Sequence, residues 1–284
     1  MKIPQEVPSF LALKELTDGF VREREWERFH LPKNIALALA GECGEVAEIF
    51  QWRGSLDHGL TADFTQSDID HISEEIADVC IYSTRLCSVC NIDLAKTVKY
   101  LVRGFDETCY PVSNSWDLYS FQELSSDILK SPLRSLYFST NSPRDIALAI
   151  QGRMGAISEL FLAVKEAECV PGLYGWPREE VHKLATSVAF ICIFLSCLCR
   201  LIGRSLDRCL ADKLMKNAKK YPVDLVKGSS AKYTTYASKT KVAGSSTSRG
   251  AVILIGVASM MVGVFLGVKY SLRHMKDIGD FALP

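Results

Sequence analysis

The stretch "ALAGECGEVAEIF", residues 38–50, decides the fold, because its apolar positions recur three and four residues apart. This spacing predicts an amphipathic helix over 35–50, and a similar pattern predicts a longer helix over 69–89. Asp93 is placed as the N-cap of a further helix over 94–100. The sequence lacks the strict alternation of apolar and polar residues that is typical of strands, so we expect an all-α protein.

A second copy of the same pattern of glycines and apolar positions occurs at residues 149–161, "AIQGRMGAISELF". Sliding the chain by 111 positions brings the two stretches into register and also aligns residues near the start and the end of each half. This offset pairs Pro32 with Pro143, Gly41 with Gly152, Gly44 with Gly155, Glu48 with Glu159, and Tyr110 with Tyr221. We therefore expect a tandem duplication, with one repeat over 8–112 and the other over 119–223.

Charge and cysteine content exclude several classes of protein. The chain has 33 basic and 33 acidic residues, so no global field favours nucleic acid, and we expect no nucleic-acid partner. Of the ten cysteines, Cys87 and Cys90 form a C-x-x-C pair, but it lies in an apolar helical run without a second pair. Buried thiols in a reducing compartment are therefore favoured over disulfides or zinc ligands. The N-terminus has no signal-peptide pattern.

The C-terminal region has a different character. Residues 251–268 are 18 uncharged, mostly apolar positions, which as a helix would span ~27 Å. This predicts a transmembrane tail anchor, joined by a basic Ser/Thr-rich linker over 224–250 and holding the rest of the protein at the cytosolic side of a membrane. The mitochondrial outer membrane, the peroxisome and the endoplasmic reticulum remain alternatives. Another apolar run, 188–199, is too short to span and is expected to be a buried helix.

Two acidic pairs suggest a metal site. Glu42 and Glu45 are three positions apart on the first helix and share a face, and Glu75 and Asp78 have the same spacing on the next. If the two helices pack antiparallel, four carboxylates converge and form an oxygen-rich site suited to Mg²⁺ and a substrate phosphate. A solvated acidic face is the alternative.

These acids and the aromatic residues around them resemble the all-α, MazG-like nucleoside-triphosphate pyrophosphohydrolases, and among them the eukaryotic dCTP pyrophosphatases. The likeness runs through 24–52 and 74–82. It implies four-helix-bundle repeats and cleavage of a nucleoside triphosphate between the α and β phosphates. It also implies roles for single residues: Mg²⁺ binding by Glu42, Glu45, Glu75 and Asp78, contact with base and sugar by Trp26, His30 and Trp52, and a place near the metal for Tyr82. Glu48 is either a structural partner or the group that orients the attacking water.

The second repeat has lost these acids and kept another element. Glu42 corresponds to Arg153 and Glu45 to Ala156, while Glu75 and Asp78 correspond to Thr186 and Ala189, or to Ser187 and Phe190 if the register slips by one. The family's phosphate-contacting pattern K-x-x-x-N-x-x-K/R-Y-P is instead found at 213–222, with Lys213, Asn217 and Tyr221 in place. The resemblance thus implies that the repeats form a pseudo-dimer with one shared site, although a solvated basic helix end would also explain 213–222.

The leading interpretation is a Mg²⁺-dependent enzyme that hydrolyses (deoxy)nucleoside triphosphates, with dCTP or a modified dCTP as the favoured substrate, to the monophosphate and pyrophosphate and so cleans the nucleotide pool. Thr17 departs from the histidine typical of dCTP pyrophosphatases, which leaves the preferred base open. A catalytically weak or inactive, nucleotide-binding membrane scaffold is the alternative. The pseudo-dimer is also expected to be able to pair further into a homodimer.

Overall fold

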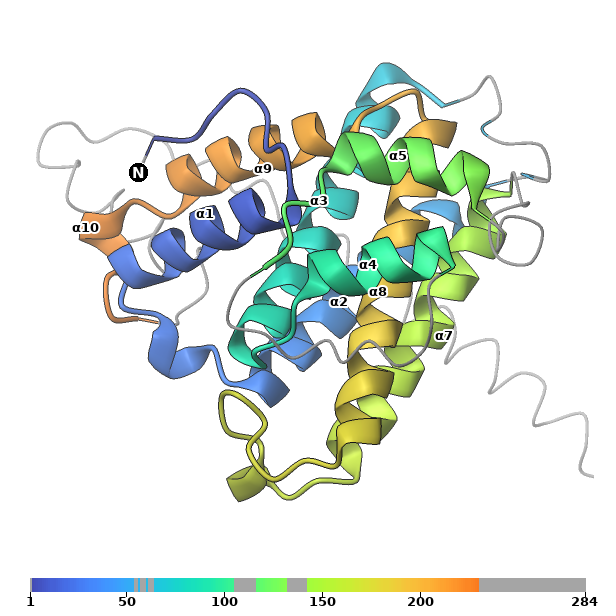
Figure 1. The fold of residues 1–284 in the computed structure, drawn as a ribbon. Coiled ribbons are helices and arrows are strands. Elements are labelled where there is room, and N and C mark those ends of the chain that lie inside the picture. Colours follow the sequence, from blue (N-terminus) through green and yellow to red (C-terminus); the bar gives the residue numbers. More distant parts are fainter. Residues whose placement is uncertain are drawn as a thin grey trace, which may run out of the picture. The chain divides into compact units, whose positions relative to one another are not determined.

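The computed structural model describes residues 2–53, 56, 60, 64–104, 116–131 and 142–229, and these residues form helices joined by turns (Figure 1). Within the described ranges there is no β-strand, and an isolated antiparallel bridge joins Ser9 to Ser120. The predicted all-α class is therefore confirmed. The predicted tail anchor, 251–268, and residues 230–250 of the predicted linker lie outside the described residues.

Local sequence signals explain where the helices of the first half begin and end. The elements are α1 (Phe10–Glu23), the 3₁₀ turn η1 (Glu27–Phe29), α2 (Pro32–Gln51), α3 (Gln66–Val89) and α4 (Leu94–Arg103). The Ser9 hydroxyl caps α1 by accepting a hydrogen bond from the Ala12 N–H at 3.2 Å. Thr65 and Asp68 form a capping box at the start of α3. Gly104, with φ of 74°, ends α4 in the left-handed region that glycine tolerates best.

The second half follows the same order of helices. Its elements are α5 (Phe121–Lys130), α7 (Pro143–Leu162), the 3₁₀ turn η2 (Glu166–Glu168), α8 (Arg178–Leu201), α9 (Leu206–Lys220) and the short α10 (Val223–Val226). Helices α2 and α7 both have 20 residues and begin with a proline, 111 positions apart. Helices α3 and α8 both have 24 residues but begin 112 positions apart, at Gln66 and Arg178.

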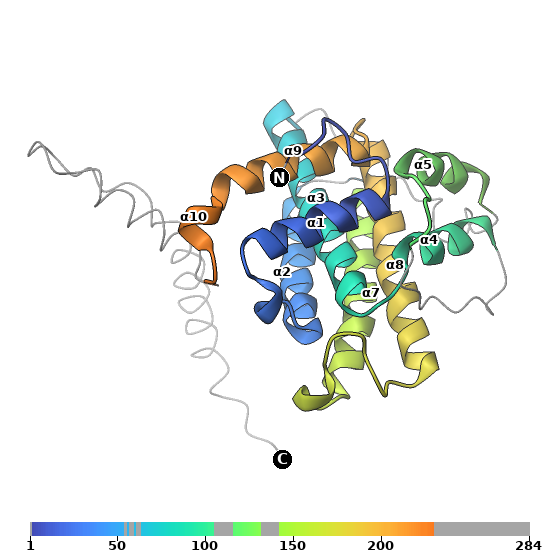
Figure 2. The same cartoon turned by 60° about the vertical axis from the view of Figure 1, so that its left-hand side comes forward.

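Four long helices, α2, α3, α7 and α8, form the central bundle, and the helices around them pack across the two halves (Figures 1 and 2). Helix α2 packs on α3 and α7, and α8 packs on α7 and α3. Helix α9 of the second half packs on α3, and α4 of the first half packs on α8. One hydrophobic core therefore extends through both halves, and its members include Leu39, Ile76, Ile150 and Leu195.

Helix α8 is the one described helix long and apolar enough to cross a membrane by length and composition, with a mean hydropathy of 2.1 over its most apolar window. However, 78% of that window is buried inside the protein, where α3, α4 and α7 cover it. The apolar run 188–199 is therefore a buried helix of the bundle, as predicted from its length.

Several contacts between the halves follow the 111-residue offset. Some join two residues that are 111 positions apart, and others occur as reciprocal pairs. The rings of Phe10 and Phe121 lie 4.5 Å apart, next to the bridge between Ser9 and Ser120. Lys33 donates a hydrogen bond to the carbonyl of Val164 at 3.0 Å. Arg144 stands 111 positions after Lys33 and donates a hydrogen bond to the carbonyl of Arg53. Arg53 stands 111 positions before Val164, so the two hydrogen bonds are reciprocal.

The nine described cysteines are buried, as predicted. They are Cys43, Cys80, Cys87, Cys90, Cys169, Cys192, Cys197, Cys199 and Cys209. Burial raises the pKa of most of these thiols, for example Cys197 to about 11, so the neutral thiol is the stable form inside the core.

Candidate active site

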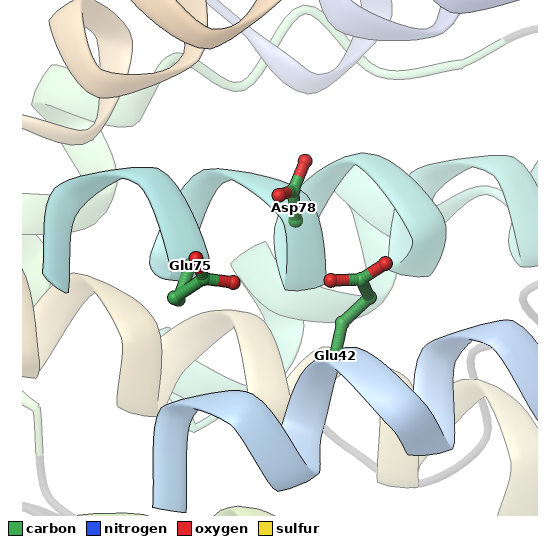
Figure 3. A group of neighbouring side chains, drawn as sticks. All are labelled: Glu42, Glu75 and Asp78. Atoms are coloured by element: carbon green, nitrogen blue, oxygen red, sulfur yellow. The ribbon is translucent and has the colours of Figure 1, made fainter. Parts of the chain in front are cut away.

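Three carboxylates of the predicted metal site converge between α2 and α3 (Figure 3). Glu42 projects from α2 toward Glu75 and Asp78 of α3, and one oxygen from each lies within 4.8 Å of the others. Glu75 is buried, and Glu42 and Asp78 are partly buried. The helical spacing of three positions places the two α3 side chains on one face, and the packing of α2 on α3 brings Glu42 to it.

The convergence has a clear electrostatic cost. Burial raises the pKa of Glu42 to about 7, and the charges of Asp78, Glu45 and Glu75 add to this effect. Burial likewise raises the pKa of Glu75 to about 7, against the opposing charge of Lys213. Like charges in a partly buried site favour protonation unless a cation compensates for them.

The donor set fits a hard divalent cation such as Mg²⁺. All three groups offer carboxylate oxygens, the ligands that this ion prefers. Moreover, Oε2 of Glu75 is buried without a hydrogen-bond partner, and buried polar atoms of this kind are rare unless an ion or water serves them. The residues present can therefore hold a divalent cation.

Other predicted residues line a cavity of about 360 Å³ beside this cluster. Its walls come from α1, η1, α2 and α3 of the first half and from α9 of the second half. The predicted residues found here are Trp26, His30, Glu42, Asp78, Tyr82, Lys213, Asn217 and Tyr221. The cavity thus joins a charged region to an aromatic one, which suits a ligand with an anionic tail and a flat ring.

The second half of the chain contributes two lysines to this cavity, Lys213 and Lys220. Lys213 of α9 forms an ion pair with Asp78 and lies 4.0 Å from Glu74. Its side chain is 11% exposed, so it is held within the site and is not a solvated helix end. Lys216, one turn further along α9, is 58% exposed and pairs with Glu74 outside the cavity.

Trp26 is fixed by the segment that follows α9. Its indole N–H donates to the carbonyl of Val226 at 3.2 Å, and its ring meets Tyr221 edge-on with centroids 5.6 Å apart. The buried guanidinium of Arg24 donates to the carbonyl of Tyr221 at 2.9 Å, while Gly228 donates its N–H to the carbonyl of Arg24 at 2.8 Å. The first residues of the predicted linker are therefore packed against the aromatic wall.

Four predicted residues do not line this cavity: Glu75, which belongs to the adjoining carboxylate cluster, and three residues at a second cavity. Glu45, Glu48 and Trp52 line a second cavity of about 470 Å³, together with His71. Glu45 remains close enough to the cluster for its charge to raise the pKa of Glu42. Trp52 is 88% exposed at the C-terminal end of α2, so the structure does not bring it together with Trp26 and His30.

The structure also contains a network that sequence reasoning missed. Arg85 of α3 donates hydrogen bonds to Nδ1 of His30 at 3.1 Å and to Asp18 of α1 at 2.6 Å. Ser88 donates to the same carboxylate at 2.9 Å. The helical spacing of Arg85 and Ser88 puts them on one face of α3, but nothing in the sequence links that face to Asp18 or His30.

Fold and site together define an all-α protein with an acidic, cation-suited site and an adjoining aromatic cavity. The chain is 40% identical over 91 residues to dCTP pyrophosphatase 1 of Rattus norvegicus and of Mus musculus, and 38% identical over 91 residues to that of Homo sapiens. Each match covers 32% of this chain and 53% of the relative, so the chain spans about half the length of the curated relatives it matches. No family model and no solved structure matches the chain. The predicted similarity to dCTP pyrophosphatases is confirmed over the matched third of the chain.

Proposed function

We propose that this protein is a Mg²⁺-dependent pyrophosphohydrolase that converts dCTP or a modified dCTP to the monophosphate and pyrophosphate. The observation that carries the proposal is the convergence of Glu42, Glu75 and Asp78 beside a cavity with an aromatic wall. The similarity to dCTP pyrophosphatases 1 supports the same reaction and points to the base.

Each group has a distinct part in this proposal. Glu42, Glu45, Glu75 and Asp78 hold the cation, which when bound neutralises phosphate charge and activates a water molecule. Lys213 and Asn217 bind the phosphates from the α9 side, and Tyr82 closes the cavity next to the carboxylates. Trp26 and His30 bind the base. A part for Trp52 remains a prediction from the family resemblance, because its exposed side chain lies apart from these two residues. Glu48 orients the attacking water.

The proposed site belongs to both halves of the chain, which we interpret as a pseudo-dimer of duplicated repeats. The reciprocal bonds made by Lys33 and Arg144 support this interpretation, because paired contacts of this kind are typical of two-fold interfaces. The equal lengths of α2 and α7, and of α3 and α8, support it as well. A duplicated chain is free of the symmetry of a homodimer, so one half can keep the acids and the other the lysine.

The direct test is release of pyrophosphate from each of the four common dNTPs by the full chain, solubilised in mild detergent with Mg²⁺. We expect dCTP to be preferred and Glu42→Gln to abolish release. Glu159→Gln is the matched control, because Glu159 is an exposed glutamate of α7 outside the site. If neither the wild type nor Glu42→Gln releases pyrophosphate from any nucleotide, the proposed enzymatic activity is refuted.

The non-catalytic alternative makes a different prediction in the same experiment. A nucleotide-binding scaffold would show a rise in melting temperature with a non-hydrolysable α,β-methylene dCTP and Mg²⁺, but would release no pyrophosphate from dCTP itself. Exposed apolar residues on α7, such as Leu148 at 69% and Leu162 at 85%, favour a further contact and keep this alternative testable.

We further propose that residues 251–268 anchor the protein in a membrane, with the enzyme on the cytosolic side. The apolar length of this segment and its basic flanks support the proposal. A fluorescent fusion to residues 225–284 would report whether the segment is sufficient for membrane targeting, and to the mitochondrial outer membrane, peroxisome or endoplasmic reticulum. A diffuse signal would rule out the anchor.

Pairing of two chains is proposed through the outward faces of α2 and α7. Leu37 of α2 and Leu148 of α7 are 71% and 69% exposed and correspond to each other at the 111-residue offset. Light scattering on the full chain would give the mass, and Leu148→Lys should convert a dimer to a monomer. If the dimer survives this substitution, the outward face of α2 and α7 is not the dimer interface.

A further inference from the structure

A chain of three polar side chains from three elements reaches the aromatic wall of the cavity. Arg85 of α3 lies in the middle, donating through Nε to Nδ1 of His30 and through Nη1 to Oδ1 of Asp18. The side chains of Arg85 and Asp18 are 11% and 17% exposed, and Ser88 donates a further hydrogen bond to Asp18. The guanidinium is therefore held from one side by an anion and faces His30 with the other.

This contact determines which nitrogen of His30 carries the proton. A guanidinium has only donors and stays charged at any physiological pH, so the atom that meets its N–H must be an unprotonated acceptor. Nδ1 of His30 is that atom, which leaves the proton on Nε2. Burial lowers the pKa of His30 to about 4, the charge of Arg85 adds to the effect, and Asp18 opposes it. His30 is consequently neutral at neutral pH.

The ring of His30 belongs to the aromatic group that lines the cavity. It stacks on Trp26 with centroids 6.4 Å apart and an interplanar angle of 30°. Trp26 in turn meets Phe20 and Tyr221 at 6.0 and 5.6 Å. Within the described ranges, Nε2 of His30 has no hydrogen-bond partner, and it is not sealed in the core. A donor without a partner thus lies beside the surface on which a flat ring can stack.

We propose that Arg85, held by Asp18, is a positioning residue that fixes His30 as an Nε2–H donor toward an acceptor atom on the edge of the nucleobase. The inference rests on the proposed function in one respect, that the cavity takes a nucleotide. A donor fixed in this way favours bases with a carbonyl oxygen or an unprotonated ring nitrogen at that edge. A base without an acceptor there leaves the donor unpaired and binds less well.

The tautomer can be measured without any activity. In the ¹⁵N-labelled full chain, long-range ¹H–¹⁵N spectra should give His30 an unprotonated Nδ1 and a protonated Nε2. The signals are assigned by their loss in His30→Gln, which separates them from the other four histidines. In Arg85→Met we expect mixed tautomers and a higher pKa of His30 than in the wild type, although burial, the larger cause of the lowered pKa, remains. A protonated Nδ1 in the wild type, or an Arg85→Met spectrum like that of the wild type, would overturn the proposal.

Binding of α,β-methylene dCTP with Mg²⁺ measures the consequence. Arg85→Met and His30→Phe should each weaken binding about fivefold or more, and the double variant should be no weaker than His30→Phe alone. His30→Gln, whose amide can supply an N–H near the Nε2 position, should retain binding and be insensitive to Arg85→Met. Additive losses would mean that Arg85 acts independently of His30 and would refute the proposal.

Controls separate this inference from folding and from the proposed reaction. Arg103→Met removes an arginine that pairs with Asp127 away from the cavity and should bind like the wild type. If Arg85→Met does not fold, Asp18→Asn loosens the same guanidinium and should change the His30 spectrum in the same direction. Coupled binding without pyrophosphate release would refute the reaction alone, whereas full turnover with a silent Arg85→Met would refute only the inference. Failure of the nucleotide to bind would refute both.

Discussion

Lys213 of α9 is ion-paired with Asp78 of α3, so a cation from the second half of the chain lies among the carboxylates of the first half. The two side chains are 11% and 13% exposed, which makes the pair a largely desolvated one. Burial raises the pKa of Asp78, and the charge of Lys213 opposes that rise. Lys213 thus serves as a counter-charge inside the cluster, and a bound divalent cation would release it to contact phosphate.

Lys213→Met should reduce kcat/KM for dCTP by about 100-fold, because it removes a preorganised positive charge from the phosphate side of the site. Lys216→Met is the matched control on the same helix, since Lys216 pairs with Glu74 outside the cavity. Steady-state kinetics of pyrophosphate release measures both. Equal turnover in wild type and Lys213→Met would show that Lys213 only packs in the structure, and it would refute the hypothesis of a site shared by the two halves.

The metal-free protein should lose stability as the pH rises from about 4.5 to about 7. The pKa values of Glu42 and Glu75 are raised to about 7 from an ordinary value of 4.5, so the folded state binds protons more tightly than the unfolded state. Stability from this source is fully present below the unfolded pKa and is lost as the pH passes the folded pKa. Thermal melts in the presence of a chelator, recorded across this range, would show the decline.

Mg²⁺ should reverse that decline, because it binds the deprotonated carboxylates. The difference in melting temperature with and without Mg²⁺ is expected to be small near pH 5 and to grow through about pH 7. Glu42→Gln removes one of the carboxyl groups whose pKa is raised. It should therefore weaken both the loss of stability with rising pH and the stabilisation by Mg²⁺. A pH-independent response to Mg²⁺ in the wild type would show that the ion binds elsewhere.

Eight of the nine described thiols should be unreactive in the native state. All nine are buried, and burial raises the pKa of most of them. Cys209 differs, because hydrogen bonds from Cys199 and Ser73 lower the pKa of its thiol against the effect of burial. Titration with a chromogenic disulfide in buffer should label Cys209 before the other eight, and unfolding in denaturant should release the rest. Rapid labelling of all nine without denaturant would contradict the packed core.

The sequence predicted those features that depend on local periodicity. The helix over 35–50 corresponds to α2, and that over 69–89 lies within α3, because an apolar stripe three to four residues apart needs only a packed neighbour. The acidic pairs were predictable for the same reason: a spacing of three fixes both members on one helix face, and Glu42, Glu75 and Asp78 do converge.

Features that depend on loops and on distant partners could not be read from the sequence. The starts of α3 and α8 are 112 positions apart, which favours the predicted register in which Ser187 and Phe190 correspond to Glu75 and Asp78. The network of Asp18, His30 and Arg85 joins side chains up to 67 positions apart, and only the packing of α1 on α3 brings them together. Helical spacing carries no information about such partners.

Arg144 should contribute more to stability than a typical surface arginine. Its guanidinium donates to the carbonyl of Phe50 at 3.0 Å and to that of Arg53, at the C-terminal end of α2. The last carbonyls of a helix have no partners within it, and a cation there also interacts favourably with the helix dipole. Arg144→Met should lower the free energy of unfolding by about 1–3 kcal/mol. Urea denaturation followed by circular dichroism measures the change.

The reciprocal hydrogen bond, donated by Lys33, should also contribute to the stability of the fold, but less than the bonds of Arg144. Lys33→Met removes the equivalent but single bond, to the carbonyl of Val164, and should cost less than Arg144→Met. Lys183→Met is the control, because its ion pair with Glu179 is exposed on α8 and lies within one helix, and no measurable loss is expected there. If Arg144→Met were as stable as Lys183→Met, the bonds between α7 and the end of α2 would not hold the two halves together. The core shared by α2, α3, α7 and α8 would then do so alone.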